Sequence, residues 1–294
     1  ENFDKAFVLL ESVINDLKPE EAALKNLVSD IIKVRADNKL DKEKILWDAM
    51  FSYGKYGAKS HYTDIMTEQE LAAIDPMQLI NAIKELPNYK QKILYYGPLS
   101  EDALKTKLNN DYTLIPDNLK EAPVPVKYEE LTTSDNTVYV VNYPDMVQAE
   151  ILMLTKKENY DKDKIPYIAL YNEYFGGGMA GIVFQELRES KALAYSTFSS
   201  FTIPNKKEKA HYNLAYIGTQ SDKLPEAMTG LFQLLNDMPE SEITYNSAKD
   251  NLIQKFNTER ITKAGILNSY LSAQKLGLDH DIRKDIYDKA QTLS

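Results

Sequence analysis

Few histidines are present in this sequence to bind a catalytic zinc ion. The chain has three histidines, His61, His211 and His280, which lie far apart along its 294 residues. None stands in a helical His-x-x-Glu-His motif or its inverse, which would place two imidazoles and a carboxylate around one zinc ion. Cysteine is absent, so thiolate metal sites, disulfides and a cysteine nucleophile are excluded. The sequence has no Gly-x-Ser-x-Gly elbow, so we expect no serine triad. We also expect no metal site, and the alternative is a metal site assembled from residues far apart in the sequence.

A run of glycines is the most distinctive local feature. Gly176, Gly177 and Gly178, followed by Met-Ala-Gly181, fit the Gly-x-Gly-x-x-Gly spacing of dinucleotide-binding turns. Such a turn must follow a strand, whereas a helix is predicted directly before these glycines, and no acidic residue ends a second strand at the expected distance. Two compatible interpretations are left: a helix end with a tight turn between helices, or a platform that a peptide backbone can approach closely.

An arginine and a tyrosine follow the glycines, seven residues apart. Residues 181–190 predict a helix whose buried side carries Ile182 and Leu187, and Arg188 lies near its end. Tyr195 stands where the next predicted strand begins. Taken alone, Arg188 is expected to pair with a glutamate on the surface, and Tyr195 to be an ordinary strand residue. A functional role for the two is the alternative.

Hydrophobic spacing and the positions of Gly and Pro predict the elements around these residues. In the first part of the chain we expect helices at 3–17, 19–34, 41–53 and 100–108, two short helices within 67–86, and a strand at 91–96. In the second part we expect strands at 138–142, 149–154, 195–203 and 210–218, and helices at 165–175, 180–190, 224–235, 240–262 and 266–276. The first two of these later strands should pair across 143–145, and residues 204–207 should form a hairpin.

Strands and helices do not alternate strictly in this pattern, which favours an α+β fold with two domains, each a mixed sheet covered by helices on one face. Pro116, Pro123 and Pro125 lie close together in a charged stretch, so we place a linker at 116–136. The predicted domains are residues 1–115 and 137–294. Both are expected to be incomplete, because the first helices lack preceding strands and the sequence stops soon after a helix.

Charge and hydropathy narrow the possible partners. The formal net charge is −9, which argues against nucleic acid because nucleic-acid binding requires a basic face. No apolar run approaches the roughly 18 residues of a membrane-spanning helix, and no signal peptide is visible. The sequence begins with Glu1, which we interpret as a cut or processed end.

One segment carries a family resemblance. Asn172-Glu-Tyr-Phe-Gly-Gly-Gly-Met-Ala-Gly-Ile-Val-Phe-Gln-Glu-Leu-Arg-Glu-Ser-Lys-Ala-Leu-Ala-Tyr-Ser196 resembles the domain without zinc of the M16 metallopeptidases, which include pitrilysin, insulin-degrading enzyme and the mitochondrial processing peptidase. The order of elements agrees with this resemblance over the rest of the chain. It implies two domains of the LuxS/MPP-like metallohydrolase type: the C-terminal portion of one (1–115) and the following domain (137–294). They would come from the C-terminal half of an enzyme whose two halves close around a chamber.

The resemblance implies that the two halves have different roles. Zinc and its His-x-x-Glu-His helix lie in one half, and the opposite half supplies an arginine and a tyrosine that hold the peptide substrate. Here these would be Arg188, a charged and fork-shaped donor, and Tyr195, whose phenol can donate to a carbonyl or a developing oxyanion. The turn of Gly176, Gly177 and Gly178 would also lie against substrate. This chain alone is then expected to bind no zinc and to cleave no peptide.

Three alternatives stay open. In the main hypothesis the zinc motif lies on the opposite half, in the same polypeptide or in a separate subunit. In the first alternative it lies upstream of Glu1, in the missing front of the first domain. The chain can be an inactive structural subunit, as are the core proteins of respiratory complexes. The glycine spacing leaves a nucleotide-binding module as the third hypothesis. Family analogy makes a bacterial periplasm or an organelle plausible, and nothing in the sequence itself indicates a compartment.

Overall fold

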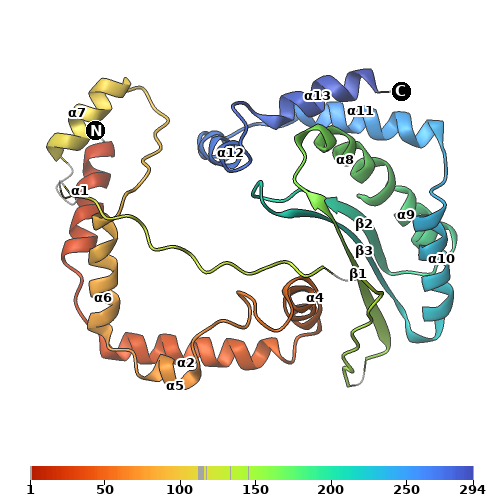
Figure 1. The fold of residues 1–294 in the computed structure, drawn as a ribbon, viewed down its shortest axis with the longest axis horizontal. Helices are drawn as coiled ribbons and strands as arrows, with labels where there is room; N and C mark the ends of the chain where they lie inside the picture. Colours follow the sequence, from red (N-terminus) through yellow and green to blue (C-terminus); the bar gives the residue numbers. More distant parts are fainter. Residues whose placement is uncertain (1, 112–115, 117, 133, 145, 294) are drawn as a thin grey trace. The chain divides into compact units, whose positions relative to one another are not determined.

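The computed structural model describes residues 2–111, 116, 118–132, 134–144 and 146–293, and the chain forms two compact units (Figure 1). Unit 1 consists of Glu1–Asp41 and His61–Tyr128, and unit 2 consists of Lys42–Ser60 and Glu129–Ser294. Each unit is therefore built from two segments that are separated in the sequence. The division differs from the boundaries expected from the sequence because residues 42–60 pack into unit 2; the expected domain boundaries stay a prediction.

Unit 1 is helical in its described residues. Its helices are α1 (Asn2–Asn15), α2 (Glu21–Asn38), α5 (Glu68–Ala72), α6 (Pro76–Glu85) and α7 (Glu101–Asp111), and Leu86–Asn88 form a 3₁₀ turn. The predicted break between the two short helices is confirmed. Asp75 caps α6 by accepting a hydrogen bond from the Met77 N–H at 2.8 Å, and Pro76 takes the first helical position.

The strand predicted at residues 91–96 is wrong. These residues belong to no strand, and an isolated bridge nearby joins Tyr89 to Lys120. Ile93 and Tyr96 are 46% and 50% exposed. Apolar composition is not sufficient for a strand, because a strand must also pair with a neighbouring strand. The described residues of unit 1 contain no strand with which these residues could pair.

Unit 2 contains an antiparallel sheet of three strands, β1 (Gln148–Asn159), β2 (Ser196–Thr202) and β3 (Ala210–Gln220), in the order β1-β3-β2. Ala215 of β3 lies opposite Met153 of β1 and Ser199 of β2. The hairpin predicted at 204–207 joins β2 to β3 and makes this pair antiparallel. The α+β class is confirmed, but the described sheet is antiparallel and not mixed as expected.

The strand predicted at residues 138–142 is also wrong. β1 pairs with β3 instead of with this segment. Val138 and Val140 are each 84% exposed, although β-branched side chains favour strands. The pairing expected across 143–145 includes residue 145, which lies outside the described residues, and the described residues on either side do not pair.

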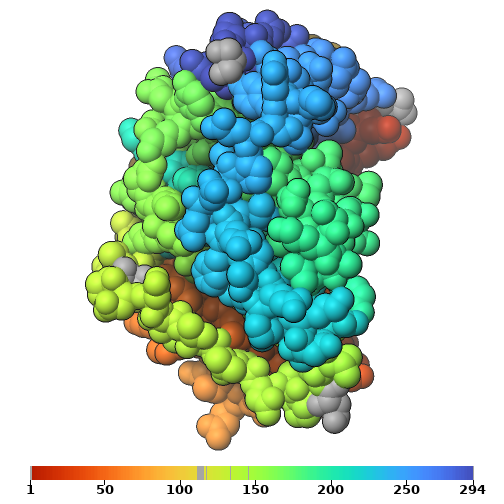
Figure 2. Space-filling view, turned by 90° about the vertical axis from the view of Figure 1, so that its right-hand side faces the viewer, coloured from red at the N-terminus to blue at the C-terminus, as the bar shows by residue number. Residues whose placement is uncertain are grey.

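Helices cover one face of the sheet (Figure 1). The helices against the sheet are α8 (Ile165–Tyr171) with its π-helical continuation η4 (Asn172–Gly176), α9 (Ile182–Phe184) with its π-helical continuation η5 (Gln185–Ser190), and α10 (Leu224–Asn236). α11 (Glu242–Thr258) and α13 (Ile282–Thr292) pack on α8. Their apolar sides and one side of the sheet form the core, whose most buried members include Phe175, Val183, Leu187, Ile217 and Leu231. In the view of Figure 2, α10 and α11 lie on the surface of this unit.

The other face of the sheet is covered by a segment from much earlier in the sequence. It comprises α3 (Lys42–Lys44), the π-helix η1 (Ile45–Met50) and α4 (Phe51–Tyr56). Trp47 stacks on Phe198 with the ring centroids 5.9 Å apart and lies 5.1 Å from the ring of Tyr216. The sheet is therefore covered on both faces and not on one face as expected.

Two ion pairs hold the ends of this segment, one to β1 directly and one through Glu130, a loop residue that also accepts the Ala210 N–H of β3 at 3.1 Å. Lys42 Nζ lies 2.8 Å from Glu150, and Lys55 Nζ lies 3.3 Å from Glu130, whose side chain is 6% exposed. Burial and the neighbouring Glu150 raise the pKa of the Tyr216 phenol to about 12, so this ring stays neutral at physiological pH. These contacts explain why residues 42–60 belong to unit 2.

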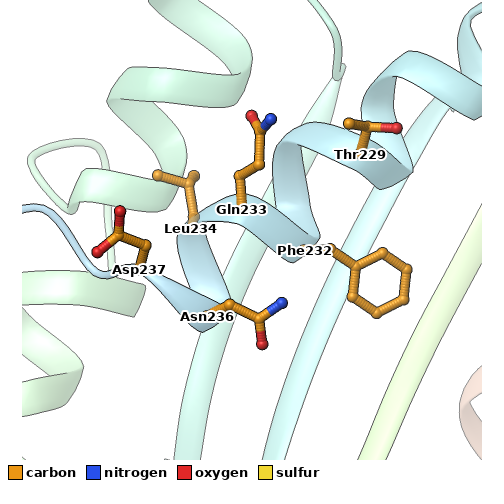
Figure 3. A pocket seen from close by; sticks show the side chains of 6 residues that line it. All are labelled: Thr229, Phe232, Gln233, Leu234, Asn236 and Asp237. Atoms are coloured by element: carbon orange, nitrogen blue, oxygen red, sulfur yellow. The ribbon is translucent and has the colours of Figure 1, made fainter.

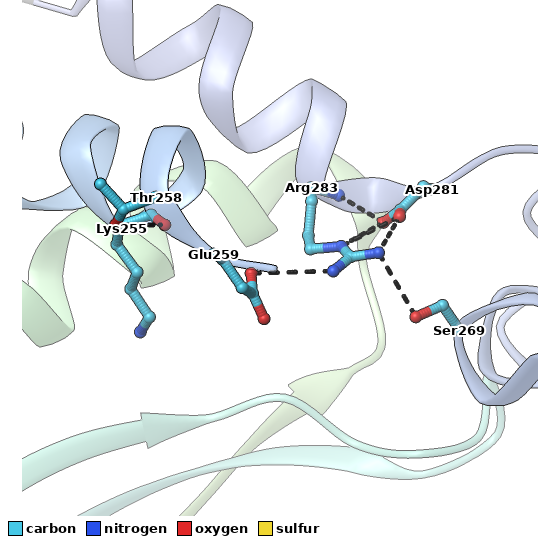
Figure 4. A network of polar contacts seen from close by, with 6 residues as sticks. All are labelled: Lys255, Thr258, Glu259, Ser269, Asp281 and Arg283. Carbon is cyan, nitrogen blue, oxygen red and sulfur yellow. Dashed lines mark hydrogen bonds and ion pairs between the residues drawn. The ribbon is translucent and has the colours of Figure 1, made fainter. Parts of the chain in front are cut away.

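Arg283 connects the last three helices (Figure 4). Its Nε lies 2.9 Å from both carboxylate oxygens of Asp281, which also caps α13 by accepting the Arg283 N–H at 3.1 Å. The guanidinium reaches Ser269 of α12 (Lys263–Lys275) at 3.4 Å and Glu259, directly after α11, at 3.7 Å. One side chain thus holds three helix segments in place.

Most helices of unit 2 lie where the sequence predicts them. The predictions for α8 with η4, α9 with η5, α10, α11 and α12 are confirmed within a few residues. α13 was not predicted, because charged residues are frequent in it and only two of its residues, Ile286 and Ala290, are buried. Among the described helices of the whole chain, none is long and apolar enough to cross a membrane.

Candidate functional site

The three histidines do not form a metal site. His211 is fully buried, with Nδ1 2.9 Å from the Thr202 carbonyl oxygen and Nε2 accepting the Asp161 N–H at 3.3 Å. His280 has each ring nitrogen on an aspartate oxygen, at 2.6 and 2.8 Å, and His61 lies in unit 1. In the described part of the chain, no group of three or more His, Asp or Glu side chains could hold a metal ion. These residues therefore do not fit the zinc ion that the resemblance implies for the complete enzyme.

The glycine turn joins η4 to α9, and two of its glycines are packed against backbone. Gly176 is buried, and a β-carbon there would lie 1.8 Å from the Ser199 carbonyl oxygen of β2. A β-carbon at Gly177 would lie 2.6 Å from the carbonyl oxygen of Asn172. Gly178 differs, because it is exposed, has a φ of 66°, and would place a β-carbon in open space. The predicted helix end with a tight turn is confirmed, and Gly178 is the glycine of this run that faces solvent.

Asn172, the first residue of η4, attaches the segment that leads into this turn to the outer edge of β2. Its Nδ2 donates to the Phe201 carbonyl oxygen at 3.0 Å, and its Oδ1 accepts the Phe201 N–H at 2.8 Å. β2 is an edge strand of the described sheet, so the outward-facing N–H and carbonyl of Phe201 have no neighbouring strand to pair with. The Asn172 amide supplies both hydrogen bonds instead. Together with the packing of Gly176 on Ser199, these bonds attach the glycine turn to β2.

Arg188 lies on η5 and reaches solvent. Its guanidinium carbon lies 4.8 Å from the ring centroid of Phe184, four residues earlier, within the range of a cation–π contact. Its Nε is 3.7 Å from the Glu189 carboxylate, and the Arg188 side chain is 46% exposed, so this ion pair is weak. Arginine carries five N–H donors, and no hydrogen bond in the described structure uses those of Arg188. They are available to a ligand.

Tyr195 directly precedes β2 and is 54% exposed. Its N–H donates to the Gly218 carbonyl oxygen of β3 at 2.9 Å, which fixes its backbone to the sheet. Its phenol oxygen accepts a hydrogen bond from Gln220 Nε2 at 3.0 Å. The hydroxyl is thus held on the surface at the end of the sheet.

Residues 191–194 connect the arginine helix to the tyrosine and are held in one conformation. Ala192 has a φ of 50°, a left-handed conformation that costs an alanine roughly 1 kcal/mol. The Leu193 N–H donates to the Leu187 carbonyl oxygen at 2.8 Å. Thr219 Oγ1 donates to the Leu193 carbonyl oxygen at 2.6 Å, and Lys223 Nζ to the Ala192 carbonyl oxygen at 3.2 Å. The spacing between Arg188 and Tyr195 is therefore set by a fixed connection.

Of the sequence-predicted residues, the structure places the glycine turn and Tyr195 at β2, and Arg188 on η5, which packs on the same strand. The glycine turn packs against the middle of the strand, and Arg188 and Tyr195 lie at the two ends of the connection that leads into it. Arg188 and Tyr195 do not hydrogen-bond to each other in the described structure. All three features present donors or open backbone, and none is a general base. Donors of this kind can hydrogen-bond to the carbonyl groups of a peptide.

Four supporting residues were not predicted from the sequence: Asn172, Thr219, Gln220 and Lys223. Each donates or accepts across segments more than 20 residues apart in the chain. No periodicity or motif indicates such contacts. Gln220 gave the best available signal, a polar residue two positions beyond the predicted end of the strand at 210–218.

A separate open hollow lies at the C-terminal end of α10 (Figure 3). Its volume is about 630 Å³, and it is lined by Thr229, Phe232, Gln233, Leu234, Asn236 and Asp237. Asp237 is the one ionisable side chain in this lining, and no predicted site residue takes part. The hollow therefore offers a contact surface with few groups that could take part in catalysis.

Comparison with known families gives one match. The profile described as the peptidase M16 inactive domain matches residues 87–247 of this chain, more than half of its length. Among curated protein sequences, none matches the chain significantly.

Solved structures with this fold agree with the family match. A peptidase M16 inactive domain from Pseudomonas fluorescens has a TM-score of 0.68 at 17% identity, covering 98% of this chain and 69% of that chain. A protease from Helicobacter pylori has a TM-score of 0.71 at 15% identity, covering 100% and 71%. The ferredoxin protease FusC, solved in complex with Arabidopsis ferredoxin, has a TM-score of 0.69 at 12% identity, covering 98% and 32%. At these identities the likeness establishes the fold.

Proposed function

This chain belongs to the peptidase M16 inactive domain family, and from that membership we propose that it is the substrate-holding, chamber-closing portion of a zinc-dependent metalloendopeptidase. Zinc is bound by a partner half, in the same polypeptide or in a separate subunit. The ligand of this chain is a peptide. The chain binds no zinc and cleaves no peptide on its own.

The observation that carries the proposal is a pair of exposed donors at the two ends of a fixed connection. Arg188 offers a planar fork of N–H groups, which matches a peptide carbonyl or carboxylate better than a point charge does. Tyr195 offers one hydroxyl proton from a position anchored to β3. Because the backbone between them is already ordered, binding a peptide requires little further loss of conformational freedom.

The glycine turn extends the same surface in this proposal. Gly178 is exposed and has no side chain, so a peptide backbone can lie close to it. Gly176 and Gly177 act indirectly, because they let η4 and the turn pack tightly enough on β2 to present Gly178. FusC, solved with a ferredoxin bound, is consistent with a polypeptide ligand for this fold.

The proposal is tested by Arg188→Ala and Tyr195→Phe in the complete enzyme, with kcat and KM measured on a peptide substrate. Each substitution is expected to lower kcat/KM about tenfold or more, the effect of losing a hydrogen bond that involves charge or supports the transition state. Arg260→Ala and Tyr270→Phe are matched controls on other parts of the surface and should leave turnover unchanged. Circular dichroism should show every variant folded.

Two outcomes would contradict the proposal. Wild-type turnover in both Arg188→Ala and Tyr195→Phe would remove these residues from substrate binding. No turnover by the correctly folded complete protein, with zinc present, would favour the alternative of an inactive structural subunit.

A further inference from the structure

Gln220 stands at the end of β3 with its side chain directed to Tyr195. Its backbone lies opposite Gln148 of β1. It also precedes the 3₁₀ turn η6 (Ser221–Lys223) but does not use its side chain to cap it. Instead, its Nε2 donates to the phenol oxygen of Tyr195 at 3.0 Å. Glutamine is not among the residues that commonly cap helices, and the hydrogen bond to the tyrosine is the contact that its side-chain amide makes here.

The direction of this hydrogen bond determines what Tyr195 can do. A phenol has one proton to donate and accepts through its oxygen lone pairs. The Gln220 N–H occupies the acceptor side of the oxygen, so the proton is left for a ligand. A donor on the oxygen also polarises the O–H bond and strengthens it as a donor.

We propose, on the premise of the function proposed above, that Gln220 is a positioning residue that sets the Tyr195 hydroxyl as a hydrogen-bond donor to a carbonyl oxygen of the bound peptide. The group recognised is therefore an acceptor, a peptide carbonyl or the oxyanion that develops from it. Gln220 itself does not contact the reacting atoms.

The surrounding contacts allow this role to be separated from a role in folding. Thr219 donates to the Leu193 carbonyl oxygen at 2.6 Å, and the Tyr195 N–H donates to the Gly218 carbonyl oxygen at 2.9 Å. Both bonds hold the backbone without help from the Gln220 side chain. Removing that side chain therefore releases the phenol and leaves its backbone attached to β3.

A double-mutant cycle in the complete enzyme tests the proposal: wild type, Gln220→Ala, Tyr195→Phe and the double variant, each with kcat and KM on a peptide substrate. Gln220→Ala is expected to lower kcat/KM about three- to tenfold, the net effect of one hydrogen bond. In the Tyr195→Phe background the same substitution should change kcat/KM by less than about twofold, because no hydroxyl is left to orient.

Two further variants sharpen the cycle. Gln220→Glu replaces the donor by a carboxylate that can only accept, so it competes with the peptide for the tyrosine proton and should be more damaging than Gln220→Ala. Gln274→Ala is the matched control, since Gln274 Nε2 donates to the Tyr270 hydroxyl at 2.6 Å on the exposed surface of α12. It should leave kcat/KM unchanged.

The outcomes distinguish this inference from the function on which it rests. A loss in Gln220→Ala that disappears in the Tyr195→Phe background supports it. Wild-type activity in Gln220→Ala, or an equal loss of activity in both backgrounds, overturns this inference. If Tyr195→Phe still lowers activity in that case, the proposed function is unaffected. Wild-type activity in Tyr195→Phe overturns both.

Discussion

Replacing Gly176 by alanine tests the attachment of the glycine turn to β2. The added β-carbon would lie 1.8 Å from the Ser199 carbonyl oxygen and 2.5 Å from its carbonyl carbon, against about 3.5 Å for an ordinary contact. Both atoms belong to backbone, and Ser199 is paired with Ala215 of β3, so β2 cannot easily retreat. The turn and η4 must move away from the strand instead.

The magnitude follows from what that movement disrupts. Overpacking a well-packed site costs about 1–3 kcal/mol. The two hydrogen bonds between Asn172 and the Phe201 backbone span the same contact, and each contributes about 1 kcal/mol. We expect Gly176→Ala to lower the free energy of unfolding of unit 2 by about 3–5 kcal/mol.

Urea unfolding followed by tryptophan fluorescence measures this effect. Trp47 is the single tryptophan of the chain and stacks on Phe198 of β2, so its emission reports on unit 2. Gly178→Ala is the matched control. The added β-carbon would contact no atom, and the expected cost is about 1 kcal/mol, because an alanine must adopt the positive φ of 66°. If Gly176→Ala is no more destabilising than Gly178→Ala, the turn is not attached to the strand as described.

Three further predictions concern stability. Trp47→Ala is expected to lower the free energy of unfolding by about 3 kcal/mol, because it removes the ring that covers the second face of the sheet; a urea midpoint equal to that of the wild type, measured by circular dichroism, would contradict this. Asp281→Ala should cost about 1–2 kcal/mol, because it removes the cap of α13 and the main partner of Arg283; an unchanged melting temperature would argue against the network. Hydrogen bonds to Asp279 and a second aspartate raise the pKa of His280, so the protonated imidazole stabilises the fold most below about pH 6.5, and this contribution is lost as pH rises through the raised pKa. The melting temperature of His280→Gln should therefore fall below that of the wild type at about pH 5.5 and approach it at about pH 8.5, and an equal difference at both would refute the assignment.

The helices could be predicted from the sequence because their signals are local. Asp75 and Pro76 mark the start of α6, and the glycines from Gly176 mark the end of η4. The resemblance of residues 172–196 to M16 peptidases pointed to the family that the profile match establishes. The roles of Arg188 and Tyr195 are carried by that resemblance and stay predictions.

The strands could be predicted only in part, because a strand depends on a partner elsewhere in the chain. The strands predicted at 149–154, 195–203 and 210–218 are confirmed, whereas 91–96 and 138–142 have similar apolar composition but no partner in the described structure. β propensity does not distinguish these two cases.

The contacts that hold the candidate site could not be predicted at all. Asn172 meets Phe201 across 29 residues, and Gln220 meets Tyr195 across 25. Trp47 covers a sheet that begins about a hundred residues later. Such contacts depend on the folded arrangement, and neither periodicity nor a local motif encodes them.

The most direct test of the account is peptide cleavage by this chain alone, by the zinc-bearing half alone and by the two combined, each with and without a zinc chelator. The account predicts cleavage in the combination only, its loss with chelator and its return when zinc is added back. Absence of cleavage in the combination, with both parts folded and zinc bound to the partner half, would contradict the claim that this chain holds substrate for a zinc peptidase.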